Sequence, residues 1–95
     1  MPLIRIVKMS FAPDKVDDFI KTFNERKEMI ASFEGCTGVE LLRDIQNTNI
    51  FFTYSKWDNE HSLENYRNSE LFNTVWDTVK QWFAGKPEAW SVEQV

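Results

Sequence analysis

The chain has 95 residues and a net charge of −4; 42% of its residues are hydrophobic and 15% are aromatic. This content excludes a disordered chain, and only three glycines and three prolines exclude a collagen-like or linker-like sequence. The sequence contains no basic cluster and no apolar run near the ~20 residues of a membrane-spanning helix, so we expect neither nucleic acid nor a membrane as a partner.

The first third of the chain predicts a strand followed by a helix. Residues 3–11 alternate loosely and carry apolar side chains on both faces, which is typical of a strand covered on both sides. Pro13 and Asp14 suit the first turn of a helix, because proline is tolerated there and an acidic side chain favours its positive end. Apolar side chains then recur at helical spacing to about Ser32.

The middle of the chain predicts a β-hairpin. Residues 33–38 form a connection rich in residues that break regular structure. Val39–Asp44 and Ile50–Trp57 are predicted as strands, the second of them rich in aromatic and β-branched side chains. The polar residues 46–49 form the turn between them.

A helical segment broken in two follows the hairpin. Asp58 or Asn59 is able to cap a helix over about residues 60–67. Asn68 and Ser69 interrupt the helical pattern, and Ser69 is able to cap a second helix in turn. The sequence therefore predicts two short helices here in place of one long one.

The end of the chain completes the pattern of elements. Gly85 and Pro87 are expected to end the last helix, and residues 89–95 form a short final strand. The order is β-α-β-β-α-β, the ferredoxin-like split βαβ arrangement. We therefore expect one α+β domain over residues 1–95, with a four-stranded antiparallel sheet and helices on one face.

The second face of this sheet predicts a homodimer. Helices cover one face only, and an uncovered apolar face of this size usually marks an interface. Domains this small also need extra stabilisation, and one cysteine and one histidine exclude an intrachain disulfide and a structural zinc site. Phe19 and Phe23 are assigned to the helix–sheet core. The dimer interface is expected to take part of a further aromatic set: Phe11, Phe51, Phe52 and Trp90.

The N-terminal stretch bears on cellular location. Arg5 and Lys8 interrupt its apolar residues, which breaks the core of a secretory signal peptide. A single cysteine, Cys36, is typical of a reducing compartment. We therefore expect a cytoplasmic protein.

Several short motifs together point to a known family. They are Phe33-Glu34-Gly35-Cys36, Phe52-Thr53-Tyr54-Ser55-Lys56-Trp57, Leu63, Asn68-Ser69 and Phe72. With these spacings the chain resembles the antibiotic biosynthesis monooxygenase family of dimeric α/β-barrel proteins over nearly its whole length. The resemblance implies a homodimer whose two sheets form one barrel. The family includes cofactor-independent oxygenases of aromatic polyketides, quinol oxygenases and haem-degrading enzymes, and also many members with no demonstrated activity.

The same resemblance disfavours the haem-degrading branch. The positions that match that branch's asparagine, tryptophan and histidine look like Val7, Tyr66 and Trp76 here, and none keeps the required type. Haem iron needs an axial ligand, and His61 is the only imidazole in the chain. Quinol-oxygenase-like relatives often carry histidines at the position of Tyr66 and near Leu71, and both are absent as well.

Tyr66 and Trp76 are the leading candidates for the site. Tyr66 replaces a pocket residue of the relatives and is assigned the catalytic role, hydrogen-bonding a substrate oxygen or assisting proton transfer. The alternative is a tyrosine that packs at the edge of the core. Trp76 is assigned to stacking on a flat substrate, with simple core filling as the alternative.

Trp57 and Asn68 are further substrate-binding candidates. The alternative for Trp57 is closure of the sheet end against the next helix. The alternative for Asn68 is helix capping. Among the charged residues, Arg5 or Arg43 is able to hold a substrate anion, unless a cross-strand ion pair with Glu40 accounts for them.

These assignments predict a cofactor-independent monooxygenase without metal or organic cofactor. Its substrate is a small planar aromatic, quinol-like or anthrone-like, bound in a pocket between sheet and helices. The substrate's own reactivity with oxygen supplies the chemistry, and the protein supplies a dry aromatic pocket. The alternative is a non-catalytic dimeric barrel that binds a small ligand or acts in signalling.

Overall fold

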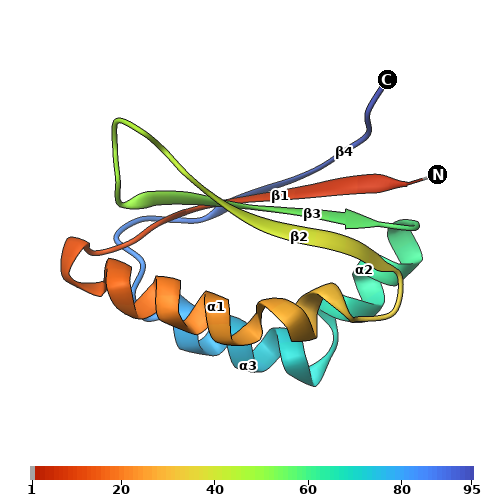
Figure 1. The fold of residues 1–95 in the computed structure, drawn as a ribbon, viewed down its shortest axis with the longest axis horizontal. Helices are drawn as coiled ribbons and strands as arrows, with labels where there is room; N and C mark the ends of the chain where they lie inside the picture. The colour runs from red at the N-terminus through yellow and green to blue at the C-terminus, as the bar shows by residue number, and fades with distance from the viewer. Residues whose placement is uncertain (1) are drawn as a thin grey trace.

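The computed structural model describes residues 2–95 and has helices on one face of a single sheet (Figure 1). The elements are β1 (Leu3–Ser10), a 3₁₀ turn at Pro13–Lys15, α1 (Val16–Ala31), β2 (Cys36–Arg43), β3 (Ile50–Trp57), α2 (Glu60–Arg67), α3 (Glu70–Lys80) and β4 (Glu88–Val92). All neighbouring strands are antiparallel, in the order β2-β3-β1-β4. The predicted ferredoxin-like α+β fold with a broken second helix is confirmed. No helix among residues 2–95 is long and apolar enough to cross a membrane.

The register of the strands decides which side chains face the helices. Side chains alternate between the two faces of a sheet, so paired residues and their second neighbours share a face. The helix-facing set of the two central strands is Arg5, Val7 and Met9 of β1 with Ser55, Thr53 and Phe51 of β3. The opposite, open face carries Ile4, Ile6, Leu42, Phe52, Tyr54, Trp90 and Val92.

The core lies between this helix-facing side and α1, and Phe11 is at its centre. Phe11 is fully buried, stacks on Phe19 with ring centroids 4.0 Å apart, and meets Phe51 edge-on at 6.0 Å. Of the four aromatic residues from which the interface was expected to draw, Phe11 and Phe51 therefore belong to the intramolecular core. Phe52 and Trp90 do lie on the open face.

Several element boundaries differ from the sequence expectation, and the final strand ends at Val92 instead of Val95. β2 begins at Cys36, because the chain pairs with β3 through a bulge between Cys36 and Gly38 instead of looping out. α3 ends at Lys80, well before Gly85. Tertiary pairing ends it early, since Phe83 forms an antiparallel bridge with Phe11 and the Ala12 N–H donates to the Trp82 carbonyl at 2.9 Å.

Side-chain caps define the break between α2 and α3. The Asn59 side chain accepts from the Ser62 N–H at 2.9 Å, which starts α2 as predicted. The Ser69 hydroxyl accepts from the Phe72 N–H at 3.1 Å and donates to the Tyr66 carbonyl. One serine thus ends one helix and starts the next, and the chain turns between Tyr66 and Phe72.

Gly35 gives a direct test of this packing. Its φ is +88°, and a Cβ at this position would collide with the Ser62 side chain of α2. We expect Gly35→Ala to lower the free energy of unfolding by about 2–4 kcal/mol, through backbone strain and overpacking. Gly85→Ala is the matched control, because a Cβ there meets nothing within 4 Å. Urea unfolding followed by circular dichroism measures both, and equal stability of the two variants would refute the account.

Candidate functional site

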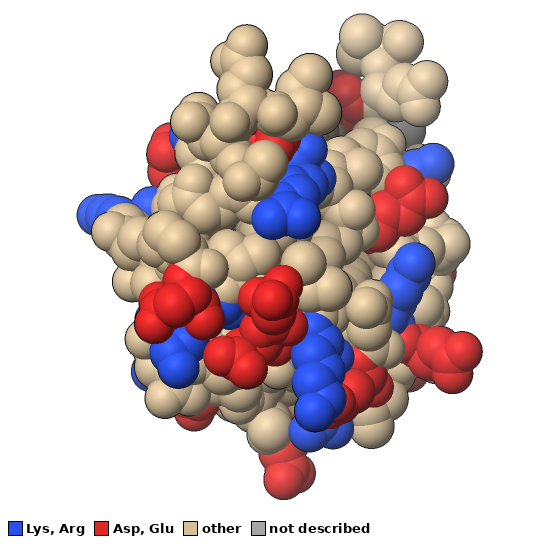
Figure 2. Space-filling model, turned by 60° about the vertical axis from the view of Figure 1, so that its left-hand side comes forward, with Lys and Arg blue, Asp and Glu red and all other residues tan. Residues whose placement is uncertain are grey.

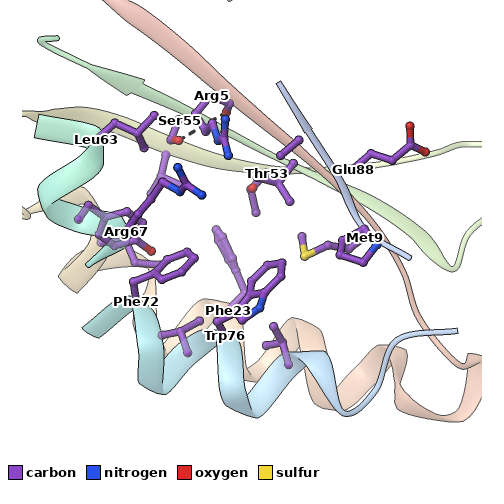
Figure 3. A pocket seen from close by; sticks show the side chains of 18 of the residues that line it. Arg5, Met9, Phe23, Thr53, Ser55, Leu63, Arg67, Phe72, Trp76 and Glu88 are labelled. Atoms are coloured by element: carbon purple, nitrogen blue, oxygen red, sulfur yellow. Dashed lines mark hydrogen bonds between the residues drawn. The ribbon is translucent and has the colours of Figure 1, made fainter. Parts of the chain in front are cut away.

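A cavity of about 270 Å³ lies between the sheet and the helices. Its wall is mostly apolar and aromatic, with Phe23 from α1, Tyr66 from α2, and Phe72 and Trp76 from α3. The sheet, which lies across the top of the view in Figure 3, contributes Thr53 and Ser55, among others. Enclosed apolar clefts with a few polar groups are the usual form of small-molecule sites.

Tyr66 is held in the wall by aromatic neighbours on three sides. Its ring stacks on Trp57 with centroids 5.0 Å apart and meets Phe33 and Phe72 edge-on, each at 5.3 Å. Burial, with a smaller contribution from Cys36, raises the pKa of Tyr66 to about 12. The phenol therefore keeps its proton at neutral pH. In the cavity it is a hydrogen-bond donor and a poor base.

Trp76 supplies the flat part of the wall. It lies nearly parallel to Phe72, with an interplanar angle of 13° and centroids 5.7 Å apart, and meets Phe83 edge-on at 5.5 Å. Phe83 in turn packs on Phe11, so the wall continues into the core. The structure thus brings Tyr66 and Trp76 to the same cavity.

Trp57 and Asn68 lie outside the cavity wall. Trp57 is 1% exposed, and its indole N–H donates to the Ser55 hydroxyl at 2.9 Å. It holds Ser55 and Tyr66 in place from behind. The exposed Asn68 is the C-cap residue of α2, and its side-chain amide donates to the Glu64 carbonyl at 3.0 Å.

The structure separates the two arginines that the sequence offered as anion ligands. Arg5 lines the cavity, whereas Arg43 donates to the Thr48 carbonyl at 2.6 Å and lies over the Phe51 ring at the hairpin end. Glu40 pairs in register with Tyr54 on the open face, and β3 separates β2 from β1. Arg5 therefore does not form the cross-strand ion pair with Glu40 that was the alternative to anion binding.

Sequence reasoning missed several wall residues. They are Thr53, Ser55, Arg67 and Phe72. Strand alternation does place Thr53 and Ser55 on the same face as Phe51, so that signal was present. Arg67 follows Tyr66 on a short helix, and nothing in the local pattern indicates that it reaches the cavity.

The cavity offers few groups for metal or acid–base chemistry. Within residues 2–95 no group of three or more His, Cys, Asp or Glu side chains is placed to hold a metal ion. His61 is exposed on α2 and is not part of the wall. Among the wall residues within 2–95, the one acidic side chain is that of Glu88. Its carboxylate lies 4.0 Å from the Lys8 ammonium.

The raised pKa of Tyr66 can be measured. We expect the 295 nm absorbance of the folded protein to show an ionisation with a midpoint near pH 12 that is absent from Tyr66→Phe. The unfolded chain releases this proton near pH 10, so the free energy of unfolding falls as pH rises from about 10 to 12. Tyr66→Phe lacks this fall. Loss of an ionisation with a midpoint near 10 in the variant would contradict the burial argument.

Comparison with known proteins identifies the family. A model of the antibiotic biosynthesis monooxygenase family matches residues 2–78. No curated protein matches the chain.

Solved structures share the fold at low sequence identity. A conserved protein from Methanosarcina mazei superposes with a TM-score of 0.93 at 19% identity, covering 100% of this chain and 94% of that one. A structure named antibiotic biosynthesis monooxygenase gives 0.90 at 16%, covering 98% of both. Rv0793 from Mycobacterium tuberculosis gives 0.89 at 12%, covering 100% and 96%. These likenesses establish the fold, and the match over residues 2–78 establishes that the chain belongs to the antibiotic biosynthesis monooxygenase family.

Proposed function

We propose that this protein is a monooxygenase that oxidises a small planar aromatic, quinol-like or anthrone-like, in the cavity between sheet and helices. The observation that carries the proposal is the aromatic wall of Tyr66, Phe72 and Trp76 around about 270 Å³ of space. Membership of the antibiotic biosynthesis monooxygenase family supports the reaction class.

The substrate itself supplies the electrons in this scheme. An electron-rich phenol or anthrone first loses a proton to water. The anion then passes one electron to O₂, and the resulting radical pair combines into a peroxide anion. This anion takes a proton back from water and becomes a hydroperoxide. Loss of water breaks the O–O bond and leaves a carbonyl, so that one oxygen atom enters the product and the other leaves as water.

The cavity residues act on the charge of the substrate. The neutral Tyr66 phenol donates a hydrogen bond to the substrate oxygen on which negative charge develops, and this stabilises the anion in a site of low polarity. Phe72 and Trp76 stack on the flat ring system and fix its orientation. The apolar wall keeps bulk water away from the radical pair.

A non-catalytic ligand-binding barrel is the second candidate. The observation that favours it is that neither an imidazole nor an unpaired carboxylate is found among the wall residues within 2–95 to accept the substrate proton. Oxygen consumption discriminates the two. Saturable binding of a quinol or anthrone without oxygen uptake would support the binder.

The open face supports a homodimer as the working form. Ile4, Ile6, Phe52 and Trp90 share this face, and Trp90 is 42% exposed. Figure 1 shows the face without any helix over it. Figure 2 shows acidic and basic side chains interspersed on one side of the molecule. A second sheet packed on the open face would bury its apolar side chains.

Activity can be tested with 1,8-dihydroxy-9-anthrone and a naphthohydroquinone in an oxygen electrode. We expect enzyme-dependent uptake above autoxidation, with one atom from ¹⁸O₂ in the product. Tyr66→Phe should lower kcat by a factor on the order of 100, because it removes the donor to the developing anion. Trp76→Leu should raise KM about fivefold to tenfold through lost stacking.

Tyr54→Phe is the matched control for the lost hydroxyl. Tyr54 lies on the open face, away from the cavity. The kcat of Tyr54→Phe should therefore equal that of the wild type. An unlabelled product, or equal rates for the Tyr66 and Tyr54 variants, would count against the proposed reaction.

The dimer has its own measurement. We expect sedimentation equilibrium at micromolar concentration to give about twice the 11.3 kDa mass of the chain. A charge on the open face, Phe52→Glu or Trp90→Glu, should give the monomer mass with an unchanged circular dichroism spectrum. Met29→Glu is the control, because Met29 is 48% exposed on α1, away from the sheet. A monomeric wild type would refute the dimer.

A further inference from the structure

Arg5 is a half-buried cation in the wall of a mostly apolar cavity. It occupies β1 on the same face as Val7 and Met9, so strand alternation directs it toward the helices. Figure 3 shows its guanidinium entering the space between the sheet and α3, above Thr53 and Phe72. A charged group in such surroundings is expected to have a partner of opposite charge.

Arg5 finds no such partner among residues 2–95, because none of the ion pairs formed there includes it. Its guanidinium donates a hydrogen bond from Nη1 to the Ser91 hydroxyl at 3.0 Å. A guanidinium has five N–H donors, so most of its capacity is free for a ligand. Burial and, after it, the nearby Arg67 lower the pKa of Arg5, against the opposing effect of Glu64.

Arg67 adds a second guanidinium to the same wall. It comes from α2, and Figure 3 shows it on the same side of the cavity as Arg5. Its own ion pair with Glu64, at 3.3 Å, is solvent-exposed and therefore weak. Glu88 points away from both arginines in Figure 3 and lies near Lys8. An overall acidic chain thus presents a local excess of positive charge to the cavity.

We propose that the cavity selects planar aromatic molecules that carry a carboxylate, with Arg5 as the anchor of the carboxylate and Arg67 as the second guanidinium beside it. This rests on the proposed function in one respect only, that both use the same cavity. The planar guanidinium of arginine matches the two oxygens of a carboxylate, which favours two-point binding. The aromatic body of the ligand then lies against Phe72 and Trp76.

Two ligands of similar shape test whether the cavity prefers a negatively charged ligand. 2-Naphthoate and 2-naphthamide differ in charge, and calorimetric titration of the full chain measures the dissociation constant of each. We expect the wild type to bind the carboxylate about 10–100 times more tightly, the range for hydrogen bonds to charged groups. Added salt should weaken the preference. Equal binding of the two probes, or no binding of either at millimolar concentration, would overturn the proposal.

Variants assign the preference to Arg5. Arg5→Met should bring the ratio of the two dissociation constants close to one, and Arg5→Lys should keep part of it, since the charge remains and the planar fork is lost. Arg26→Met is the matched control, because Arg26 is on α1 and outside the wall. A preference that survives in a folded Arg5→Met overturns the assignment. If Arg5→Met does not fold, Arg67→Met and the salt dependence replace it, and a preference that both leave unchanged likewise overturns the proposal.

The binding result is independent of oxygen chemistry. A carboxylate preference without oxygen uptake by any substrate removes the monooxygenase and leaves the anion site. Oxygen uptake without a carboxylate preference removes the anion site and leaves the monooxygenase.

Discussion

A sheet that carries apolar side chains on both faces can be covered by its own helices on one face only, and this constraint organises the molecule. β1 and β3 place Met9 and Phe51 under α1, where they pack with the fully buried Phe11. The same strands place Ile6 and Phe52 on the opposite face. Burial of one set makes the monomer fold, and exposure of the other leaves a surface that is costly to keep in water.

The cavity forms where the helix-facing side of the sheet stops being apolar. Arg5 and Ser55 are partners in the register, and Thr53 is the next residue of that face. Polar side chains cannot be packed against a helix without partners, so close packing ends there. The break at Ser69 turns the chain at the same level and brings Tyr66 and Phe72 to the gap. The site is thus a consequence of local sequence in two distant segments.

The sequence alone was sufficient for the parts of the structure that depend on short-range patterns. Capping chemistry located Ser69 and narrowed the cap of α2 to Asp58 or Asn59. The aromatic and β-branched content of β3 located that strand to the residue. The predictions that failed depend on which strands are neighbours in the sheet, and short-range patterns do not show this. The alternative role of Arg5, a cross-strand ion pair with Glu40, required β1 and β2 to be adjacent, whereas β3 lies between them. α3 ended early for a similar reason, because Phe83 pairs with Phe11 far away in the sequence. Trp57 lies behind the wall, since its indole bonds to Ser55.

One physical effect links the proposed reaction to the proposed ligand. Burial in the cavity opposes charge on two titratable groups of the wall: it raises the pKa of Tyr66 and lowers the pKa of Arg5. A neutral ligand does nothing to offset the desolvation cost of the Arg5 charge. An anionic ligand gives the guanidinium its missing partner and, in a medium of low polarity, strengthens the hydrogen bond that the Tyr66 phenol donates to a negative oxygen. The same desolvation that makes Tyr66 a donor and not a base therefore favours a substrate that brings its own negative charge into the cavity.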